Sequence, residues 1–263
     1  MPLVFSAICP HPPIIIPQIG QENIRLVGQT INALLNLEKK LVAHKPEIII
    51  LVSPHSPLMP DKFICLNGDC LKGDFAHFGH PEISLEFKTN QQLIQKIKKE
   101  FGPLIEIIPE NNLDHGALVP LFYLTSGKLN NLNLILLGFS FLSLDVHFDF
   151  GQRLGKIIKE SNKRIAFIAS GDLSHRLNRE APAGYSPYGL KFDQKLIDLL
   201  KNKKIKEILN MDPYLIEEAG ECGLRSIIIA LGIISGLNYQ TEILSYESPF
   251  GVGYLVANFK LVK

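Results

Sequence analysis

Four histidines of the sequence each follow an apolar run and stand in a loop that contains proline or glycine: His11 in CPHPP, His55 in VSPHSP, His115 in LDHGALVP and His175 in ASGDLSHRL. Imidazole binds metal ions and, with a reference pKa of about 6.5, exchanges protons near neutral pH. In an α/β protein the loops that follow the strands meet at one edge of the sheet. The setting and order of these histidines therefore predict a single site.

The pair His11 and His55 is the first candidate for holding a metal. Each residue follows a strand directly and has prolines beside it. Proline restricts a loop, so the imidazole loses less freedom when it binds a cation. Taken singly, either residue could be a loop histidine bonded to the backbone. As two matching positions at strand ends they favour metal ligation.

A third metal ligand is sought in the segment YLIEEAGECGLRSIIIALG. Two histidines and one carboxylate form the facial arrangement of non-haem Fe(II) oxygenases. Glu217 and Glu218 are explained by the ordinary preference for acidic residues in a first helical turn. Glu221 and Cys222 stand between two glycines against an apolar run, where an unpaired charge is costly. These two adjacent residues are the rival candidates.

The remaining two histidines of the set are candidates for proton transfer and for substrate contact. His175 lies among Ser170, Asp172 and Ser174, which could orient its ring, and a neutral histidine beside a metal suits a general base. The alternative is a histidine that only caps its own turn. For His115, the preceding Asp114 either fixes the ring tautomer or caps the following helix.

The spacing of apolar residues alternates between strand and helix along nearly the whole chain, which predicts one α/β domain over residues 1–263 with a mixed, mostly parallel sheet flanked by helices. A pair of short strands is expected at 62–66 and 83–88, and a C-terminal hairpin at 240–247 and 252–262. Other strands are expected at 3–9, 47–53, 104–108, 132–138 and 164–170. Helices are expected at 22–44, 89–101, from 116, and at 145–161, 189–201 and 220–236.

The composition limits the classes of partner. Lys and Arg number 27 against 26 Asp and Glu in 263 residues, and no basic stripe accompanies the aromatics, which argues against nucleic-acid binding. No apolar run approaches the roughly 20 residues that span a bilayer, and the N-terminus lacks the pattern of a signal peptide, so a cytoplasmic protein without a membrane partner is expected. The four cysteines have no disulfide or CxxC spacing and are expected to be free thiols.

In this order, CPHPP, SPHSP, LDHGALVPL, SGDLSH and the GECG segment resemble the LigB-type class III extradiol ring-cleavage dioxygenases and their Memo-like relatives, which include protein B of the AmmeMemoRadiSam system. FGVGYLVA near the end resembles the closing strand of these proteins. The similarity covers essentially the whole chain. It implies a LigB-like fold.

The resemblance also implies Fe(II) held by His11, His55 and a carboxylate, with His175 as the acid/base residue and His115 close to substrate and O₂. Zinc and copper are alternatives to iron. In this family a catecholic substrate chelates iron through both oxygens, and the ring opens next to the diol. Two neutral imidazoles and one carboxylate leave a net charge of about +1 on ferrous iron, which favours an anionic catecholate.

The third ligand is where the sequence departs from a simple match. Dioxygenases of the family use a glutamate there, whereas Memo-like proteins have Cys-Gly at the same segment. We favour Glu221, because an oxygen ligand suits Fe(II) oxygen chemistry and a thiolate is open to oxidation, and we keep Cys222 as its rival. The register of the helix start is expected to decide between them.

Three functions follow from these patterns. The first is an Fe(II)-dependent extradiol dioxygenase of aromatic compound metabolism, with O₂ and a catechol, aminophenol or related small aromatic as substrates. The second is a Memo-like metal-binding redox or regulatory protein without ring cleavage. The third is a non-catalytic binding protein, against which the retention of all four histidines argues. The sequence is also compatible with a homo-oligomer.

Overall fold

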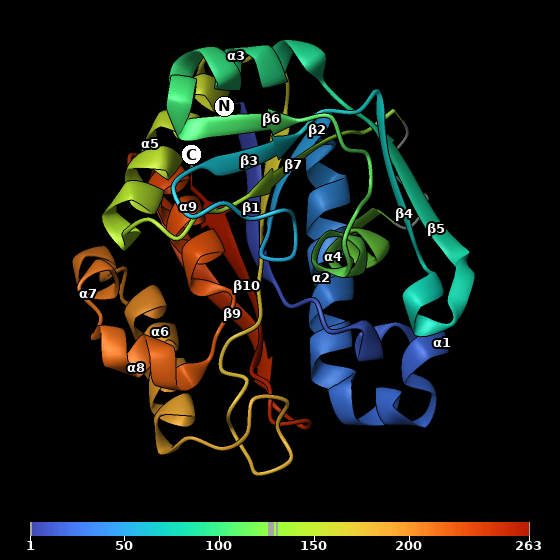
Figure 1. Cartoon of the computed structure of the whole chain (residues 1–263), viewed down its shortest axis with the longest axis vertical. Helices are drawn as coiled ribbons and strands as arrows, with labels where there is room; N and C mark the ends of the chain where they lie inside the picture. Colours follow the sequence, from blue (N-terminus) through green and yellow to red (C-terminus); the bar gives the residue numbers. More distant parts are fainter. Residues whose placement is uncertain (1, 126–128, 130, 263) are drawn as a thin grey trace.

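One mixed sheet of ten strands organises the computed structural model, which describes residues 2–125, 129 and 131–262 (Figure 1). The main path through the sheet runs β4-β5-β7-β2-β8-β1-β10-β9, and β3 and β6 extend it beside β7. The strands are β1 (Leu3–Cys9), β2 (Ile48–Ser53), β3 (Phe63–Leu66), β4 (Cys70–Phe75), β5 (His80–Lys88), β6 (Ile105–Ile108), β7 (Asn133–Gly138), β8 (Ile165–Ser170), β9 (Tyr239–Glu247) and β10 (Tyr254–Leu261).

Helices cover both faces of this sheet (Figure 1). The α-helices are α1 (Pro17–Gly20), α2 (Gly28–His44), α3 (Gln91–Phe101), α4 (His115–Thr125), α5 (Leu144–Lys159), α6 (Pro187–Lys201), α7 (Ile205–Leu209), α8 (Pro213–Ala219) and α9 (Leu224–Ile234). Short 3-10 helices are η1 (Pro13–Ile15), η2 (Gln21–Val27), η3 (Ala76–Phe78) and η4 (Gly102–Leu104). Helices α2 and α4 pack on one face, and α3, α5, α6 and α9 pack on the other.

The centre of the sheet is parallel, with β1 and β2 on either side of β8 and with β7 beyond β2. These strands are uninterrupted apolar runs because both of their faces are buried. Cys9 pairs with Ser170 at the ends of β1 and β8, and Val52 pairs with Ala169 near the ends of β2 and β8. The loops after three neighbouring strands therefore begin at the same level of the same edge.

The predicted α/β class and mixed sheet are confirmed, and so is the C-terminal hairpin, in which β9 and β10 pair antiparallel. All four cysteines are free thiols, as expected. Within residues 2–125, 129 and 131–262, the helices lack the combination of length and apolarity that a bilayer-spanning segment needs.

Three details of the predicted elements are wrong. The strands expected at 62–66 and 83–88 exist but do not pair with each other: β3 pairs with β6 and β7, and β5 pairs with β4. The sequence analysis missed β4 because CLKGDF contains Lys, Gly and Asp, which are depleted in strands. The helix expected from residue 22 starts as 3-10 helix η2 and becomes α-helical at Gly28.

The third difference concerns the segment expected as one helix over 220–236. Gly220 adopts a φ of 59° and ends α8, and α9 begins only at Leu224. Glycine reaches this left-handed conformation without steric cost, and it commonly follows the last turn of a helix. Glu221 and Cys222 therefore lie in a turn between two helices, and helical register does not decide which of them points at the histidines.

Candidate metal centre

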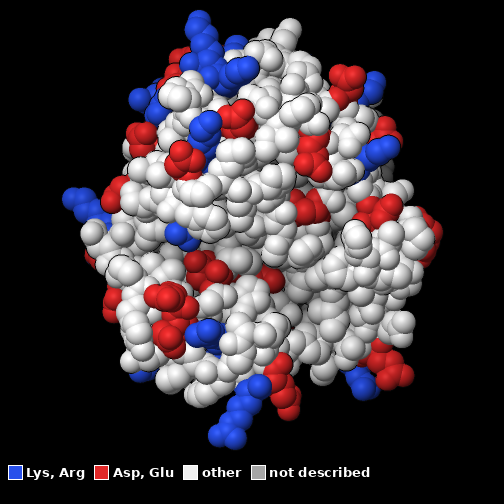
Figure 2. All heavy atoms as spheres, in the orientation of Figure 1, with Lys and Arg blue, Asp and Glu red and all other residues white. Residues whose placement is uncertain are grey.

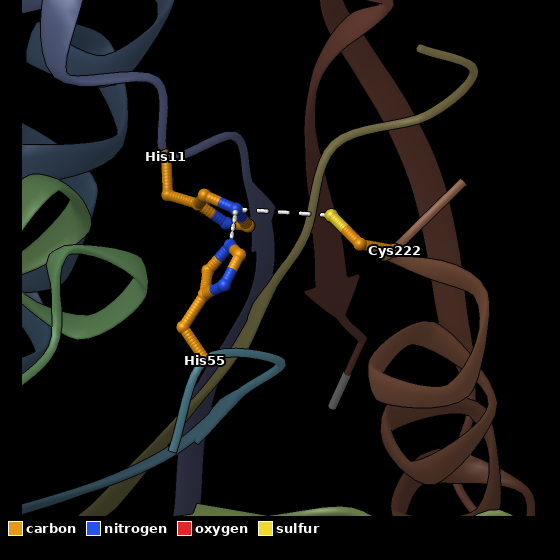
Figure 3. A group of neighbouring side chains, drawn as sticks. All are labelled: His11, His55 and Cys222. Carbon is orange, nitrogen blue, oxygen red and sulfur yellow. Dashed lines mark hydrogen bonds between the residues drawn. The ribbon is translucent and has the colours of Figure 1, made fainter. Parts of the chain in front are cut away.

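His11, His55 and Cys222 bring three potential ligand atoms together, all within 4.8 Å of one another (Figure 3). The Nε2 atoms of the two histidines are 3.0 Å apart, and the Sγ atom of Cys222 lies 3.7 Å from Nε2 of His11. His11 follows β1, His55 follows β2, and Cys222 reaches in from the turn between α8 and α9. The two histidines thus converge as the strand ends predict.

Two of the three separations, both measured from Nε2 of His11, match those of ligands on a single metal ion, and the third lies within 4.8 Å. Tetrahedral bonds of about 2.05 Å to nitrogen and about 2.3 Å to sulfur place the nitrogens about 3.3 Å apart and nitrogen and sulfur about 3.6 Å apart. The observed separations of 3.0 and 3.7 Å are close to these values. Two imidazoles and one thiolate are also a donor set that transition metals accept.

Hydrogen bonds fix which nitrogen of His11 is available. Ser170 has one hydroxyl proton and donates it to the carbonyl oxygen of Gly116, which can only accept. The hydroxyl oxygen must then accept from Nδ1 of His11, at 2.9 Å. His11 therefore carries its proton on Nδ1, and its Nε2 presents a lone pair toward His55 and Cys222.

The sulfur of Cys222 is held in place by the backbone of Asp172. The amide nitrogen of Asp172 donates to Sγ at 3.3 Å, and the carbonyl oxygen of the same residue lies 3.7 Å from Sγ. Burial raises the pKa of the Cys222 thiol well above its usual range. A metal that binds here must therefore displace the thiol proton.

Glu221 does not join this group. Its Oε2 atom accepts a hydrogen bond of 2.6 Å from the amide nitrogen of Leu224, which is the first residue of α9. A carboxylate in that position satisfies a free N–H group at the helix start and complements the helix dipole. Our preference for Glu221 as the third ligand is therefore not supported by the geometry, which places its rival Cys222 beside the two histidines.

The glycines around Glu221 and Cys222 allow the turn to lie against the loop after β8. A Cβ atom on Gly171 would lie 2.1 Å from the Cα atom of Gly223, and a Cβ atom on Gly223 would lie 2.9 Å from the carbonyl oxygen of Asp172. Both contacts are with backbone, which cannot rotate away. The close approach is what brings Cys222 within reach of His11.

We expect Gly171→Ala to destabilise the protein by about 3 kcal/mol, at the upper end of the usual cost of overpacking. The reason is that the new methyl group would force apart the two backbones that carry Asp172 and Cys222. Thermal or urea denaturation would measure the loss. Gly28→Ala is the matched control: a Cβ there meets nothing within 4 Å and the backbone is helical, so its stability should equal or exceed that of the wild type. Equal stability of both variants would contradict the packing argument.

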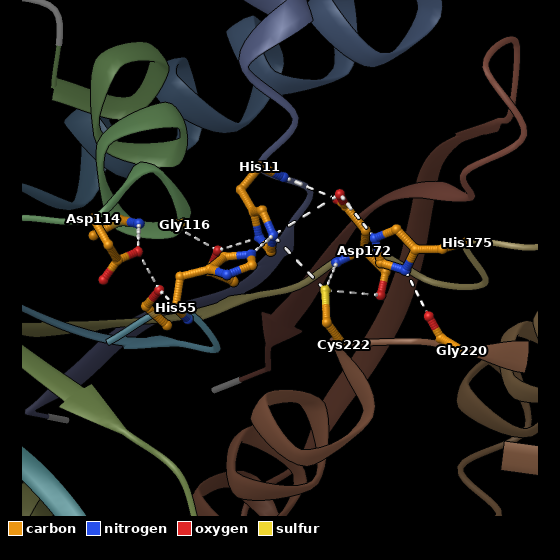
Figure 4. A network of polar contacts seen from close by, with 11 residues as sticks. His11, His55, Asp114, Gly116, Asp172, His175, Gly220 and Cys222 are labelled. Atoms are coloured by element: carbon orange, nitrogen blue, oxygen red, sulfur yellow. Dashed lines mark hydrogen bonds and ion pairs between the residues drawn. The ribbon is translucent and has the colours of Figure 1, made fainter. Parts of the chain in front are cut away.

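Asp172 and His175 lie on the side of His11 away from His55, next to Cys222 (Figure 4). Oδ2 of Asp172 lies 3.9 Å from Nε2 of His11 and 3.9 Å from Nε2 of His175, and Oδ1 accepts from the backbone nitrogen of His11 at 3.0 Å. Burial raises the pKa of Asp172 to about 7. The sequence analysis expected Asp172 only to orient His175. Its position directly after Ser-Gly at the end of a strand is the signal that could have indicated its contacts with His11 as well.

His175 is held as a neutral base. Its Nδ1 donates to the carbonyl oxygen of Gly220 at 2.7 Å, because a carbonyl can only accept, and its Nε2 is left without a proton. Burial is the main reason that the pKa of His175 lies below its usual value. His175 is therefore a candidate proton acceptor beside the three potential ligands, and the general-base role expected from the sequence stays a prediction.

His115 begins α4 and packs its ring on that of His55, with centroids 4.1 Å apart. Asp114 serves as the helix cap: its Oδ1 accepts from the amide nitrogen of Ala117 at 3.1 Å. The same carboxylate accepts from the hydroxyls of Ser53, at 2.5 Å, and Ser56, at 3.0 Å. Asp114 thus ties the loop that carries His55 to the start of α4.

The other histidines with a described environment lie outside the group. His44 is exposed and bonds the carbonyl of Lys40, and His80 pairs with Glu82 on β5. His147 is buried, with ring nitrogens 2.8 and 3.1 Å from the carbonyl oxygens of Ser143 and Ser140. His77 is exposed on η3, at the tip of the β4–β5 hairpin.

We expect His11→Ala and His55→Ala each to weaken metal binding by more than about 100-fold. Loss of a residue that only hydrogen-bonds to a metal ligand lowers metal affinity by about 10- to 100-fold, and loss of the ligand itself costs more. Metal analysis after equilibrium dialysis would measure the affinity. His44→Ala is the control for removal of an imidazole and should bind as the wild type does. Full occupancy in either of the first two variants would show that the residue is not a ligand.

Comparisons with known proteins show the family to which the chain belongs. The family described as the catalytic LigB subunit of aromatic ring-opening dioxygenase matches residues 6–257. The chain therefore belongs to the LigB family, as the motifs indicated. Its fold is shared by the crystal structure of uncharacterized protein JW3007 from Escherichia coli K12, with a TM-score of 0.68, 15% identity, and coverage of 97% of this chain and 99% of that one.

Three relatives are similar in sequence. Protein CA_C1420 of Clostridium acetobutylicum is 34% identical over 259 residues, which are 94% of this chain and 55% of that protein, so the chain spans about half of this relative's length. The 3,4-dihydroxyphenylacetate 2,3-dioxygenase of Escherichia coli is 26% identical, covering 64% of this chain and 66% of that protein. The 4,5-DOPA dioxygenase extradiol of Mirabilis jalapa is 23% identical, covering 84% and 86%. The names of the second and third relatives denote dioxygenases.

Proposed function

We propose that this protein is an iron-dependent oxidoreductase that opens the ring of a small catecholic or aminophenolic aromatic with O₂, and that His11, His55 and Cys222 hold the metal. The observation that carries the proposal is the convergence of four histidines from separate loops around one point, three of them with ring centroids 4.1 to 5.7 Å apart. The names of the relatives from Escherichia coli and Mirabilis jalapa support the choice of substrate class, since each denotes a dioxygenase of a dihydroxyphenyl compound.

The chain's own residues supply the proton chemistry of this proposal. His175 accepts a proton from a substrate hydroxyl at Nε2 and keeps its orientation through Gly220. Buried Asp172, 3.9 Å away, stabilises the imidazolium that results. A bound ferrous ion would supply an anchor for the diol and for O₂, and both atoms of O₂ enter the product as one carbon–carbon bond beside the diol breaks.

A second function, a metal-binding redox or regulatory protein without ring cleavage, is favoured by one observation. A cysteine stands where a carboxylate was expected, and thiolate ligands suit Cu(I) or Zn as well as iron. A thiolate is also open to oxidation when O₂ reacts beside it.

The two functions are distinguished by the wild-type protein purified without air and loaded with Fe(II). On addition of O₂ and a panel of catechols and aminophenols, the first function predicts uptake of one O₂ for each aromatic lost, with a ring-opened product. Tight metal binding without any loss of aromatic substrate would reject ring cleavage and leave the second function. Loading with Cu(I) or Zn in parallel identifies the metal that the donor set prefers.

A further inference from the structure

An exposed aromatic ring stands beside the histidine cluster, on the hairpin formed by β4 and β5. Phe78 is 39% exposed and lies in η3 at the tip of this hairpin. Its ring centroid is 5.8 Å from that of His115, at an interplanar angle of 70°. His115 in turn packs on His55, so a row of rings leads from Phe78 to the candidate metal ligands.

The tip that carries Phe78 is firmly held. Phe75 is fully buried at the end of β4, with ring contacts to Phe78 and to Phe122 of α4. Oδ1 of Asp74 accepts from the amide nitrogen of Ala76 at 2.8 Å, which closes the turn that precedes Phe78. An exposed phenyl group on such a fixed support is positioned for contact with something outside the chain's own core.

The hairpin is also joined to the segment that leads into His115. The amide nitrogen of Lys72 donates to the carbonyl oxygen of Asn111, and the amide nitrogen of Leu113 donates to the carbonyl oxygen of Lys72, both at 2.8 Å. A Cβ atom on Gly73 would lie 2.8 Å from the carbonyl oxygen of Leu113, so the two backbones are in close contact. The position of Phe78 relative to His115 is therefore set by backbone bonds.

Two rings of this row, those of Phe78 and His55, are exposed to solvent. His55 is exposed at the cluster although His11 is buried, so the candidate metal is reached from the side of His55 and His115. In Figure 2, the visible face of the molecule is hollowed near its centre. The hollow lies between the region of α6, α7 and α8 and the region of the β4–β5 hairpin.

We propose that Phe78 forms an aromatic wall of the substrate site and determines which planar rings bind there. The inference rests on the proposed function. A ring that reaches the metal from the open side passes the exposed face of Phe78, and offset or edge-on packing of two aromatic rings favours flat substrates over aliphatic ones. Phe78 is thus a specificity residue, and it takes no part in proton transfer.

The test is anaerobic titration of the Fe(II)-loaded protein with 4-nitrocatechol, followed by its absorption. Phe78→Ala should raise the dissociation constant about tenfold, which is 1.4 kcal/mol, while Phe78→Tyr should stay within about threefold of the wild type. Iron content should be equal in all proteins. Phe141→Ala, which removes another exposed ring, 59% exposed, in the segment after β7, is the control and should leave binding unchanged.

The outcomes separate this inference from the function on which it rests. Unchanged 4-nitrocatechol affinity in a folded, iron-loaded Phe78→Ala variant would overturn the role of Phe78 and leave the proposed function standing. An equal loss of affinity in Phe141→Ala would overturn it as well, because the effect would then be general. Failure of the wild type to bind 4-nitrocatechol would overturn the proposed function, and the inference with it.

Discussion

Cys222→Ser is expected to lower metal affinity by more than about 100-fold, whereas Glu221→Gln is expected to change it by less than about threefold. Sγ of Cys222 lies within 4.8 Å of both histidine ligand atoms, and serine is a poor substitute for a thiolate. The carboxylate of Glu221 instead accepts from the N–H group of Leu224, and the amide oxygen of glutamine can accept the same bond. Competition with a chromogenic chelator would measure both affinities.

The same pair of variants carries an internal check. Because burial keeps the Cys222 thiol protonated in the free protein, metal binding to the wild type should release a proton that Cys222→Ser does not release. Calorimetry in two buffers of different ionisation enthalpy counts these protons. Loss of the metal in Glu221→Gln with no effect of Cys222→Ser would restore the two-histidine, one-carboxylate arrangement expected from the sequence.

His175→Ala is expected to keep the metal and to lower kcat by about 10²- to 10⁴-fold, the usual contribution of a positioned general base. Its Nε2 is deprotonated and lies outside the group of His11, His55 and Cys222. Because burial lowers the pKa of His175, the ring should be neutral at pH 7, and the acid limb of the wild-type rate profile should lie below pH 6.5.

Iron content and turnover must be measured on the same preparations of His175→Ala. A proportional loss of both would assign the residue to the metal instead of to proton transfer. His175→Asn is a useful companion variant, because its Nδ2 takes the place of Nδ1 and can still donate to the carbonyl oxygen of Gly220, but the amide cannot accept a proton near neutral pH. Its turnover should be as low as that of the alanine variant.

The convergence of His11, His55 and His175 could be predicted from the sequence because each follows a parallel strand, and parallel strands end at one edge of the sheet. The choice between Glu221 and Cys222 could not be made in that way. It depends on the left-handed Gly220, which ends α8, and on the contact of Gly223 with Gly171, which is 52 positions away in the chain. Local patterns do not carry such tertiary contacts.

The position of Phe78 beside the histidines could not be predicted from the sequence for a similar reason. KGDFAHFGHPE suggests a loop, and its aromatic residues could cover a site or lie on the surface. Tertiary contacts bring Phe78 to the cluster, among them the backbone bonds that join Lys72 of β4 to Asn111 and Leu113 across some 40 residues.

The ligand set itself is tested most directly by X-ray absorption spectroscopy of the metal-loaded wild-type protein. Coordination by His11, His55 and Cys222 predicts one sulfur neighbour at about 2.3 Å and two imidazole nitrogens at about 2.0 to 2.1 Å. The sulfur neighbour should disappear in Cys222→Ser at any metal loading that can be reached. A first shell of nitrogen and oxygen only in the wild-type protein would contradict the proposed centre.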